Sequence, residues 1–342
     1  MKAARQSCEQ LFSMGADPIE PTKVRDARFD IVKGVMMLLV VFGHIPRVGY
    51  LASYTDVFAN SIYLFHTSIF MLVSGYFFSG MHGEWRDVTK IVRRLLVPYF
   101  IMAPAFVAFY WLAARMGVST TASKPEFSFL GIVRGQAGGA LWFLYSLAAI
   151  GLPLSLYFVA RRRFRGLNLP DWFAPFVSIG FVLLLNRLNG RIVVEPFCAA
   201  YFLIGYIGRR CNFEMTATPL ALLFGIPAFL VFPNAPRATL PNLVWVFSVF
   251  SFVLWFGERT QNRLVGRMLG YVGRRSMALL LFHPLICAVV RVPIFKLSAL
   301  SVFADGLSCA IIVLAVTVGL CLLVDRMLMR SMLGKCILGE MH

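Results

Sequence analysis

Residues 28–44, RFDIVKGVMMLLVVFGH, place three ionisable side chains in an otherwise apolar run: Asp30, Lys33 and His44. On a helix that turns 100° per residue, His44 lies about 20° from Lys33 and about 40° from Asp30 around the axis. The three side chains therefore share one face. A charge at membrane depth costs a few kcal/mol or more, so residues of this kind usually face the protein interior and have a function. The segment predicts a site on a membrane-spanning helix.

Three of the five histidines, His44, His66 and His283, lie in apolar runs. Imidazole titrates near neutral pH and can take a proton from an attacking hydroxyl. A single histidine in a span is more often a hydrogen-bonded packing residue, and this alternative stays open for His66 and His283. His44 differs because Asp30 and Lys33 share its face, which favours a general base.

Asp30 and Lys33 are one helical turn apart and can form an ion pair. In one interpretation the pair marks the cytoplasmic mouth of the span, with the Lys33 amine extended toward water. In the other, Lys33 is a fixed positive charge for an anionic cofactor and Asp30 orients it. The rise from Lys33 to His44 is about 16 Å. The two can therefore hold opposite ends of a long ligand that has a phosphate end and a thioester tip.

A basic cluster precedes the third apolar run, in KIVRRLLVPYF (90–100). Helical spacing puts at least two of Lys90, Arg93 and Arg94 on one face, and the planar guanidinium of Arg suits phosphate. A positive-inside anchor is the alternative interpretation. Pro98 predicts a kink or a late helix start.

Other candidates have weaker support. Trp142 begins an apolar run where aromatic residues favour the membrane interface. Glu195 is a candidate for holding a sugar hydroxyl, and an interfacial ion pair explains it equally well. Arg274 lies at the mouth of the ninth run. Ser74 and Gly75 are interpreted as packing residues, because small side chains let helices approach closely.

The composition places the whole chain in a membrane. Of its 342 residues 59% are hydrophobic and 14% are charged, and the mean hydropathy is +0.75. Soluble domains carry about 25% charged residues. Because apolar runs of about 17 to 25 residues indicate spans, we expect an all-α integral membrane protein with a bundle of about ten transmembrane helices. The runs fall near 31–49, 57–79, 94–115, 140–160, 172–188, 193–208, 217–233, 241–257, 276–295 and 303–324.

The net charge of +17 would indicate a nucleic-acid partner in a soluble protein. Here the distribution of charge favours topology instead. With ten spans and a cytoplasmic N-terminus, 23 Lys and Arg residues fall in cytoplasmic segments and 9 in the opposite loops. This asymmetry predicts that both termini are cytoplasmic, with the basic loops beside anionic lipid and no nucleic acid bound. We expect a cytoplasmic segment (1–27), a membrane domain (28–328) and a cytoplasmic tail (329–342).

Several other classes are disfavoured. The seven cysteines are scattered, and no Cys or His cluster has metal-ligand spacing, so we expect no metal. The phosphate-binding patterns GxGxxG and GxxxxGK are absent, which argues against a nucleotide-driven pump. The segment 1–27 contains no apolar core of the kind that signal peptides have.

Five short motifs in this order resemble the acyltransferase 3 family of integral membrane acyltransferases, and above all its branch similar to fucose 4-O-acetylase. The resemblance covers roughly residues 25–330. The chain departs from the family pattern at Lys33, where many members have Arg, and at Thr67 and Ser68, which replace Met-Pro. The matching residues are Asp30, Lys33 and His44; Phe65, His66, Ser74, Gly75 and Phe78; Arg93, Arg94, Pro98 and Tyr99; Trp142 and Phe143; and Gly273, Ser276 and His283.

The resemblance implies an enzyme of the bacterial cytoplasmic (inner) membrane that moves an acyl group, most often acetyl, from cytoplasmic acyl-CoA. The acceptor is a sugar hydroxyl of a cell-surface or lipid-linked glycan. His44 with Asp30 would be catalytic, either as a general base or through an acyl-imidazole. The donor phosphates would lie on Lys33, Arg93, Arg94 and Arg274. The acceptor would contact His66, Trp142, Glu195 and His283.

Two other functions use the same features. A secondary transporter or flippase for an anionic lipid or sugar also needs ionisable residues near the midplane. Against it, the two halves of the sequence show no inverted repeat. A structural partner in glycan export would not depend on His44 or Lys33.

Overall fold

The computed structural model of the chain describes residues 26–45, 52–78, 80, 82–115, 129–135, 139–164, 169–190, 192–299 and 306–340. These residues form helices and no strand, which confirms the all-α prediction. The expected cytoplasmic segment 1–27 lies almost wholly outside them. The elements are α2 (Ala27–Gly43), α3 (Ala52–Tyr76), α4 (Trp85–Ile91), η1 (Val92–Leu96), α5 (Val97–Arg115), α6 (Phe129–Val133), α7 (Leu141–Arg163), η3 (Asp171–Phe173), α8 (Ala174–Leu188), α9 (Pro196–Arg210), η4 (Pro219–Ala221), α10 (Leu222–Val231), α11 (Leu240–Thr260), α12 (Leu264–Arg274), α13 (Ser276–Ala299), α14 (Gly306–Leu328) and α15 (Met332–Ile337).

Every predicted span overlaps one α-helix, in the order α2, α3, α5, α7, α8, α9, α10, α11, α13 and α14, and the third, fifth and seventh also overlap the short elements η1, η3 and η4. By length and composition, five helices in the described ranges can cross a membrane. They are Trp85–Leu112, Leu141–Arg163, Asp171–Leu188, Leu240–Thr260 and Ser308–Leu328. A sixth span results if Leu264–Arg274 and Ser276–Arg291, which meet at 79°, count as one broken span. The described part of the chain is therefore helical and contains five or six candidate spans.

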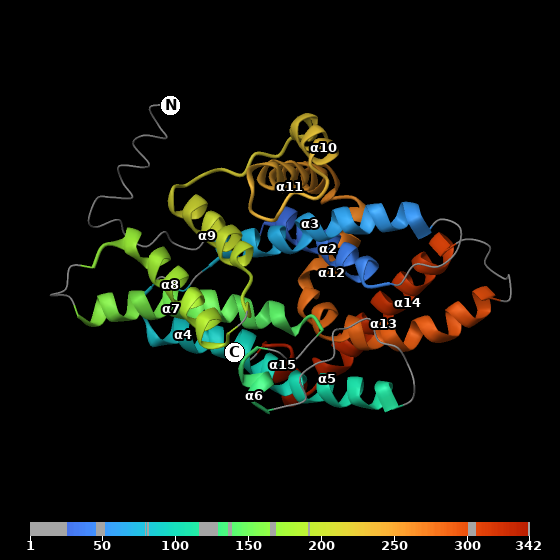
Figure 1. Cartoon of the computed structure of the whole chain (residues 1–342), viewed down its shortest axis with the longest axis horizontal. Coiled ribbons are helices and arrows are strands. Elements are labelled where there is room, and N and C mark those ends of the chain that lie inside the picture. The colour runs from blue at the N-terminus through green and yellow to red at the C-terminus, as the bar shows by residue number, and fades with distance from the viewer. Residues whose placement is uncertain are drawn as a thin grey trace.

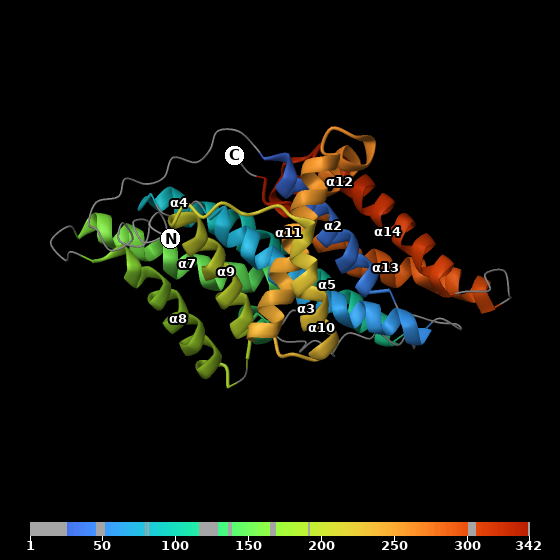
Figure 2. The ribbon, with the colours of Figure 1, turned by 90° about the horizontal axis from the view of Figure 1, so that it is seen from above.

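The first helices lie between the other elements of the bundle, with α9 on one side of α2 and α3 and with α13 and α14 on the other (Figure 1). Seen from above, α4, α12 and the C-terminal end lie along one edge of the bundle (Figure 2). Helix α2 contacts α3, α11, α12, α13 and α14. A side chain on α2 can therefore meet residues from several distant parts of the sequence.

Helix α2 has chemically defined ends. Asp26 is its N-cap and accepts a hydrogen bond from the backbone N–H of Arg28 at 2.9 Å, which satisfies one of the free donors of the first turn. The helix ends at Gly43, and His44 is its C-cap. The helix is therefore shorter than the predicted span 31–49, whose residues 46–49 lie outside the described ranges.

Glycines bring two pairs of helices together backbone to backbone. On α2 and α12, Gly34 and Gly273 each lie against the main chain of the opposite helix, so a side chain at either position would collide with it. On α3 and α9, Gly75 and Gly205 have the same relationship. Small residues permit this close approach. The predicted packing role of Gly75 is confirmed.

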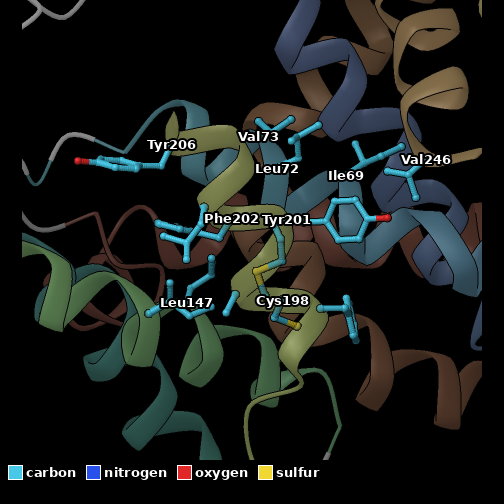
Figure 3. Packing of buried hydrophobic residues seen from close by; sticks show 14 of the residues in the cluster. Ile69, Leu72, Val73, Leu147, Cys198, Tyr201, Phe202, Tyr206 and Val246 are labelled. Atoms are coloured by element: carbon cyan, nitrogen blue, oxygen red, sulfur yellow. The ribbon is translucent and has the colours of Figure 1, made fainter. Parts of the chain in front are cut away.

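The largest apolar cluster fills the space between α3, α7, α9 and α11 (Figure 3). Asn242 on α11 provides a polar connection inside it. It accepts a hydrogen bond from the hydroxyl of Tyr201 at 2.8 Å, and its amide donates to the carbonyl of Leu64 at 3.1 Å. Buried polar groups need such partners, and these fix α3, α9 and α11 together. The labelled side chains in Figure 3 are Ile69, Leu72, Val73, Leu147, Cys198, Tyr201, Phe202, Tyr206 and Val246.

Near Pro98, where a kink or a late helix start was predicted, the structure has a π-helical turn inside one continuous helix. The third span starts at Trp85, earlier than expected, and η1 interrupts its α-helical bonding just before Pro98. Proline has no N–H, so it cannot bond the carbonyl of Arg94 one turn earlier. Gly339, at φ +68°, lies against the main chain of Arg94. The predicted tail 329–342 thus contains a helix, α15, that packs on α5.

Candidate active site

A cavity of about 210 Å³ lies between α2, α3, α7 and α13, and apolar side chains form most of its wall. Four of the residues predicted to form the site line it: Lys33, His44, His66 and Trp142. Lys33 and His44 are about 16 Å apart along α2, so the cavity extends over that length of the helix. The other lining residues are Met37, Val40, Thr67, Phe70, Ser74, Ala140, Phe143, Leu147, Ser276, Met277 and Leu280.

His44 is held in one tautomer at the end of α2. Its Nδ1 lies 2.8 Å from the carbonyl oxygen of Val40. A carbonyl can only accept, so Nδ1 carries the proton and Nε2 of the neutral ring keeps its lone pair. His44 therefore has the nitrogen lone pair that a general base needs.

His66 has the same orientation but a second partner. Its Nδ1 lies 2.6 Å from the carbonyl oxygen of Ile62, and its Nε2 lies 2.9 Å from Oγ1 of Thr67. Because Nδ1 carries the proton, the hydroxyl of Thr67 donates to Nε2. The side chains of His66 and Thr67 are buried, with 5% and 6% of their surface exposed, and both line the cavity.

The ring of His283 packs against the ring of His44. The ring centroids of His44 and His283 are 5.0 Å apart, and Nδ1 of His283 bonds the carbonyl of Leu279 at 2.6 Å. His283 is fully buried, and its Nε2 has no hydrogen-bond partner among the described residues. Tyr63 completes the cluster, with its ring centroid 6.2 Å from that of His44 and its hydroxyl donating to the carbonyl of Gly43. The ring centroid of Tyr63 also lies 5.4 Å from that of His66, so it connects His66 to the pair of His44 and His283. His283 itself does not line the cavity.

At the other end of the cavity, Nζ of Lys33 lies 3.1 Å from Oδ1 of Asp30. Asp30 is only 3% exposed and does not line the cavity. Ser276, the first residue of α13, lines it beside Lys33, because Gly273 packs on this part of α2. The free N–H groups and dipole of a helix N-terminus favour anions. Lys33 and the start of α13 thus form one positive end.

Arg93 and Arg94 line a different space, an open cleft of about 500 Å³ formed with Arg86 and Lys90. Its two carboxylates already have partners. Asp87 accepts from the backbone N–H of His82 at 3.1 Å. The Arg162 guanidinium donates to Glu84 at 2.9 Å and so holds the pKa of Glu84 below its usual value. The cleft therefore keeps its positive character at neutral pH. The eight lining residues are His82, Glu84, Arg86, Asp87, Thr89, Lys90, Arg93 and Arg94.

Two further predicted residues lie outside both spaces. The exposed Arg274 ends α12, and its guanidinium lies near Gly270. Glu195 is an exposed residue at the start of α9 and makes no capping hydrogen bond. The structure does not bring either to the cavity that holds His44.

Several residues of the site are not among the predicted ones. Thr67 departs from a family motif, and its position directly after His66 is the signal in the sequence that points to it. Ser74, predicted to be a packing residue, lines the cavity. Arg86 belongs to the basic cleft although it precedes the cluster at 90–94. In the described ranges, no three His, Cys, Asp or Glu residues lie close enough to share a metal ion.

Comparison with known proteins gives one extended match. A family model described as an acyltransferase domain matches residues 26–326. The nodulation protein NolL of Sinorhizobium fredii is 31% identical over 210 residues, which are 57% of this chain and 52% of that protein. The nodulation protein NolL of Mesorhizobium japonicum is 40% identical over 63 residues, 17% of each chain. The chain thus spans about half the length of the first relative. No solved structure matches it.

Proposed function

Because the chain belongs to the family of acyltransferase domains, we propose that it is a multi-pass membrane O-acyltransferase. It takes an acyl group, acetyl in the first place, from cytoplasmic acyl-CoA. The acceptor is a sugar hydroxyl of a cell-surface or lipid-linked glycan. The observation that supports this function best is the cavity that Lys33 and His44 line together, since a long donor needs a positive end and a distant base.

Two positive regions of the protein can bind the phosphate groups of the acyl-CoA donor. Lys33 with the first turn of α13 provides one anion site, and the cleft of Arg93 and Arg94 provides another. Neither arginine has an ion-pair partner in the part of the chain that the structure describes, so their charges are available for phosphate. The apolar wall between Lys33 and His44 suits the slender arm that carries the thioester. The exposed Arg274 would contact the outermost phosphate.

The chemistry takes place at the His44 end. Nε2 of His44 takes the proton of the acceptor hydroxyl, and general-base catalysis of this kind contributes typically about 10²–10⁴-fold. Over the whole reaction the acceptor oxygen becomes bonded to the acyl carbonyl and the donor C–S bond breaks. CoA leaves toward the basic side as the thiol, so that it carries away the equivalent of the proton that the acceptor loses. Asp30 does not contact the substrates in this proposal. Its carboxylate holds the amine of Lys33 in place through the ion pair. His66 and Trp142 contact the acceptor within the cavity, Glu195 contacts it at the membrane surface, and His283 supports the His44 ring.

The topology follows from the same proposal. The membrane domain is 28–328, with ten spans and both termini in the cytoplasm, in the bacterial inner membrane. The edge with α4, α12 and the C-terminal end (Figure 2) is the cytoplasmic one, where the basic residues of η1 and α12 meet acyl-CoA and anionic lipid. The shortest predicted span, Pro219–Val231, comprises η4 and α10 and has fewer residues than the about 17–25 that usually cross the bilayer.

The test uses the purified chain in proteoliposomes with acetyl-CoA labelled in its acetyl group. We expect the label to pass to glycan added on the other side of the membrane, and no label to reach glycan when His44→Ala replaces the wild type. Glycan counterflow without acyl-CoA, together with no transfer of label, would instead favour the transporter.

A further inference from the structure

Thr67, His66 and the carbonyl of Ile62 are arranged like a nucleophile, its base and the group that orients the base. The Thr67 hydroxyl lies 2.9 Å from Nε2 of His66, and Nδ1 of the same ring lies 2.6 Å from the Ile62 oxygen. A hydroxyl within hydrogen-bond reach of an imidazole that a third group holds in place is the signature of covalent catalysis. The backbone carbonyl replaces the carboxylate of the Ser-His-Asp arrangement, and it fixes the tautomer in the same way.

This pair opens on the space where the thioester would lie. Thr67 and His66 line the cavity together with His44 and Trp142. The indole N–H of Trp142 makes no hydrogen bond to any described residue, so it remains a donor for the oxygen of a tetrahedral intermediate. One small cavity thus contains a hydroxyl with its own base, a donor and a second base.

The size of the cavity favours two separate transfers over one. Its volume is about 210 Å³. This is below the range of roughly 300–1,000 Å³ that is usual for pockets that enclose one small-molecule ligand. Direct transfer would need the thioester arm and a sugar ring inside it at the same time. A covalent intermediate needs only one of the two substrates there at once.

We propose that Thr67 carries the acyl group as an oxygen ester between the two substrates. The inference rests on the function proposed above and describes its route. In the first step Oγ1 of Thr67 attacks the thioester carbonyl and His66 Nε2 takes its proton. The C–S bond breaks, and the thiolate receives that proton and leaves as free CoA.

In the second step the sugar enters the emptied cavity. His44 Nε2 takes the proton of the acceptor hydroxyl, whose oxygen attacks the Thr67 ester. The C–O bond to Thr67 breaks, and its oxygen receives the proton from His44. Both histidines then have their starting protonation, and no other reactant is required. The two imidazoles thus have different tasks, one in each half of the cycle.

Three variants test the route. Thr67→Ser keeps a hydroxyl beside His66, whereas Thr67→Val keeps the shape and removes the hydroxyl. Ser68→Ala is the matched control, because Ser68 is also buried on α3, with 1% of its surface exposed, but does not line the cavity. Thermal unfolding and binding of acyl-CoA establish that each variant is folded.

The experiment mixes each protein with labelled acetyl-CoA and no glycan, quenches in acid and maps the label by mass spectrometry. We expect a burst of one CoA per site and one acetyl group on Thr67 in the wild type and in the Ser68→Ala variant. Thr67→Ser should carry the label on the serine. Thr67→Val should show no burst and lose at least roughly 10²-fold in transfer to glycan, a loss typical of one catalytic group.

Two results would overturn the inference. One is normal transfer to glycan by folded Thr67→Val. The other is an acetyl group on His44 in place of Thr67. In both cases the acyltransferase function would stand, because glycan would still be acylated. Failure of that function looks different: wild-type protein that binds acyl-CoA would release no CoA and label neither itself nor glycan.

Discussion

Lys33 and His44 lie on one face of α2 and line the same cavity. Along the helix axis they are about 16 Å apart. Lys33 is tied to Asp30 by an ion pair, and His44 is tied to Val40 by its Nδ1 proton. Both side chains are therefore fixed before any ligand enters. The amine of Lys33 and Nε2 of His44 therefore select a ligand whose anionic end and reactive end are separated by a similar distance.

Replacing His44 by Ala should lower kcat by roughly 10²–10⁴-fold, since Nε2 of this ring takes the acceptor proton. The KM for acyl-CoA should change little, because the anion sites are remote from His44. Steady-state rates with varied acyl-CoA separate the two effects. A variant that keeps its kcat would contradict the assignment of His44 as a base.

Lys33 can be tested without leaving a buried charge unbalanced. Lys33→Met by itself should destabilise the protein, because the Asp30 carboxylate is 3% exposed and would lose the amine of Lys33. The double variant Asp30→Asn with Lys33→Met removes both charges and should recover most of that stability. Thermal unfolding measures the difference between the two.

The same double variant should still bind acyl-CoA more weakly, because it lacks the amine that contacts the phosphate. A hydrogen bond to a charged group contributes about 1.5–3 kcal/mol, and the lower value corresponds to a KM raised about 10-fold. Lys33→Arg keeps the charge and should stay within a few-fold of wild type. An unchanged KM in the double variant would mean that Lys33 only balances Asp30.

The basic cleft predicts a salt effect. Arg93→Gln with Arg94→Gln should raise the KM for acyl-CoA and make it less dependent on ionic strength, because exposed charges act through screened attraction. The kcat should change little, since the cleft is separate from the cavity of His44. Arg274→Gln should have a smaller effect. Kinetics between low and physiological salt measure the slope, and an equal slope in wild type and variant would exclude phosphate from the cleft.

Two glycines on α9 provide a matched pair for stability. Gly205→Ala places a methyl group against the main chain of Leu72 and should cost about 1–3 kcal/mol, as overpacking usually does. Gly208→Ala meets no atom within 4 Å. It should be neutral or stabilising by up to about 1 kcal/mol, since alanine favours a helix more than glycine does. Chemical unfolding in detergent compares them, and equal effects would contradict the backbone contact between α3 and α9.

The sequence was sufficient to predict which residues share a face of a single helix. The shared face of Lys33 and His44 needed only the turn of about 100° per residue. The positions of the long apolar helices were predictable because each predicted run overlaps one of them, whereas the short helices α4, α6, α12 and α15 lie outside every predicted run. The end of α2 at Gly43 was missed because the span was assigned from hydropathy, although Pro46 and Arg47 follow closely and a proline just past a helix is a stop signal.

Relationships between helices were harder to predict. Arg93 and Arg94 were grouped with Lys33 by charge alone, but packing places them in a separate cleft. The hydrogen bond between Thr67 and His66 could not be predicted from the sequence for a different reason. Adjacent residues point about 100° apart on a helix, so only the side-chain orientation of the histidine brings its Nε2 to the hydroxyl. The contact of Gly273 with α2 depends on a close approach that no pattern within one helix specifies.

The packing of Gly339 on Arg94 has a practical consequence. The residues after α15 touch the helix that presents the guanidinium groups of the basic cleft. An affinity tag or fluorescent fusion joined directly behind His342, three residues after Gly339, would pull on that contact and imitate a kinetic defect. Expression vectors for this chain should therefore separate such a fusion by a flexible spacer.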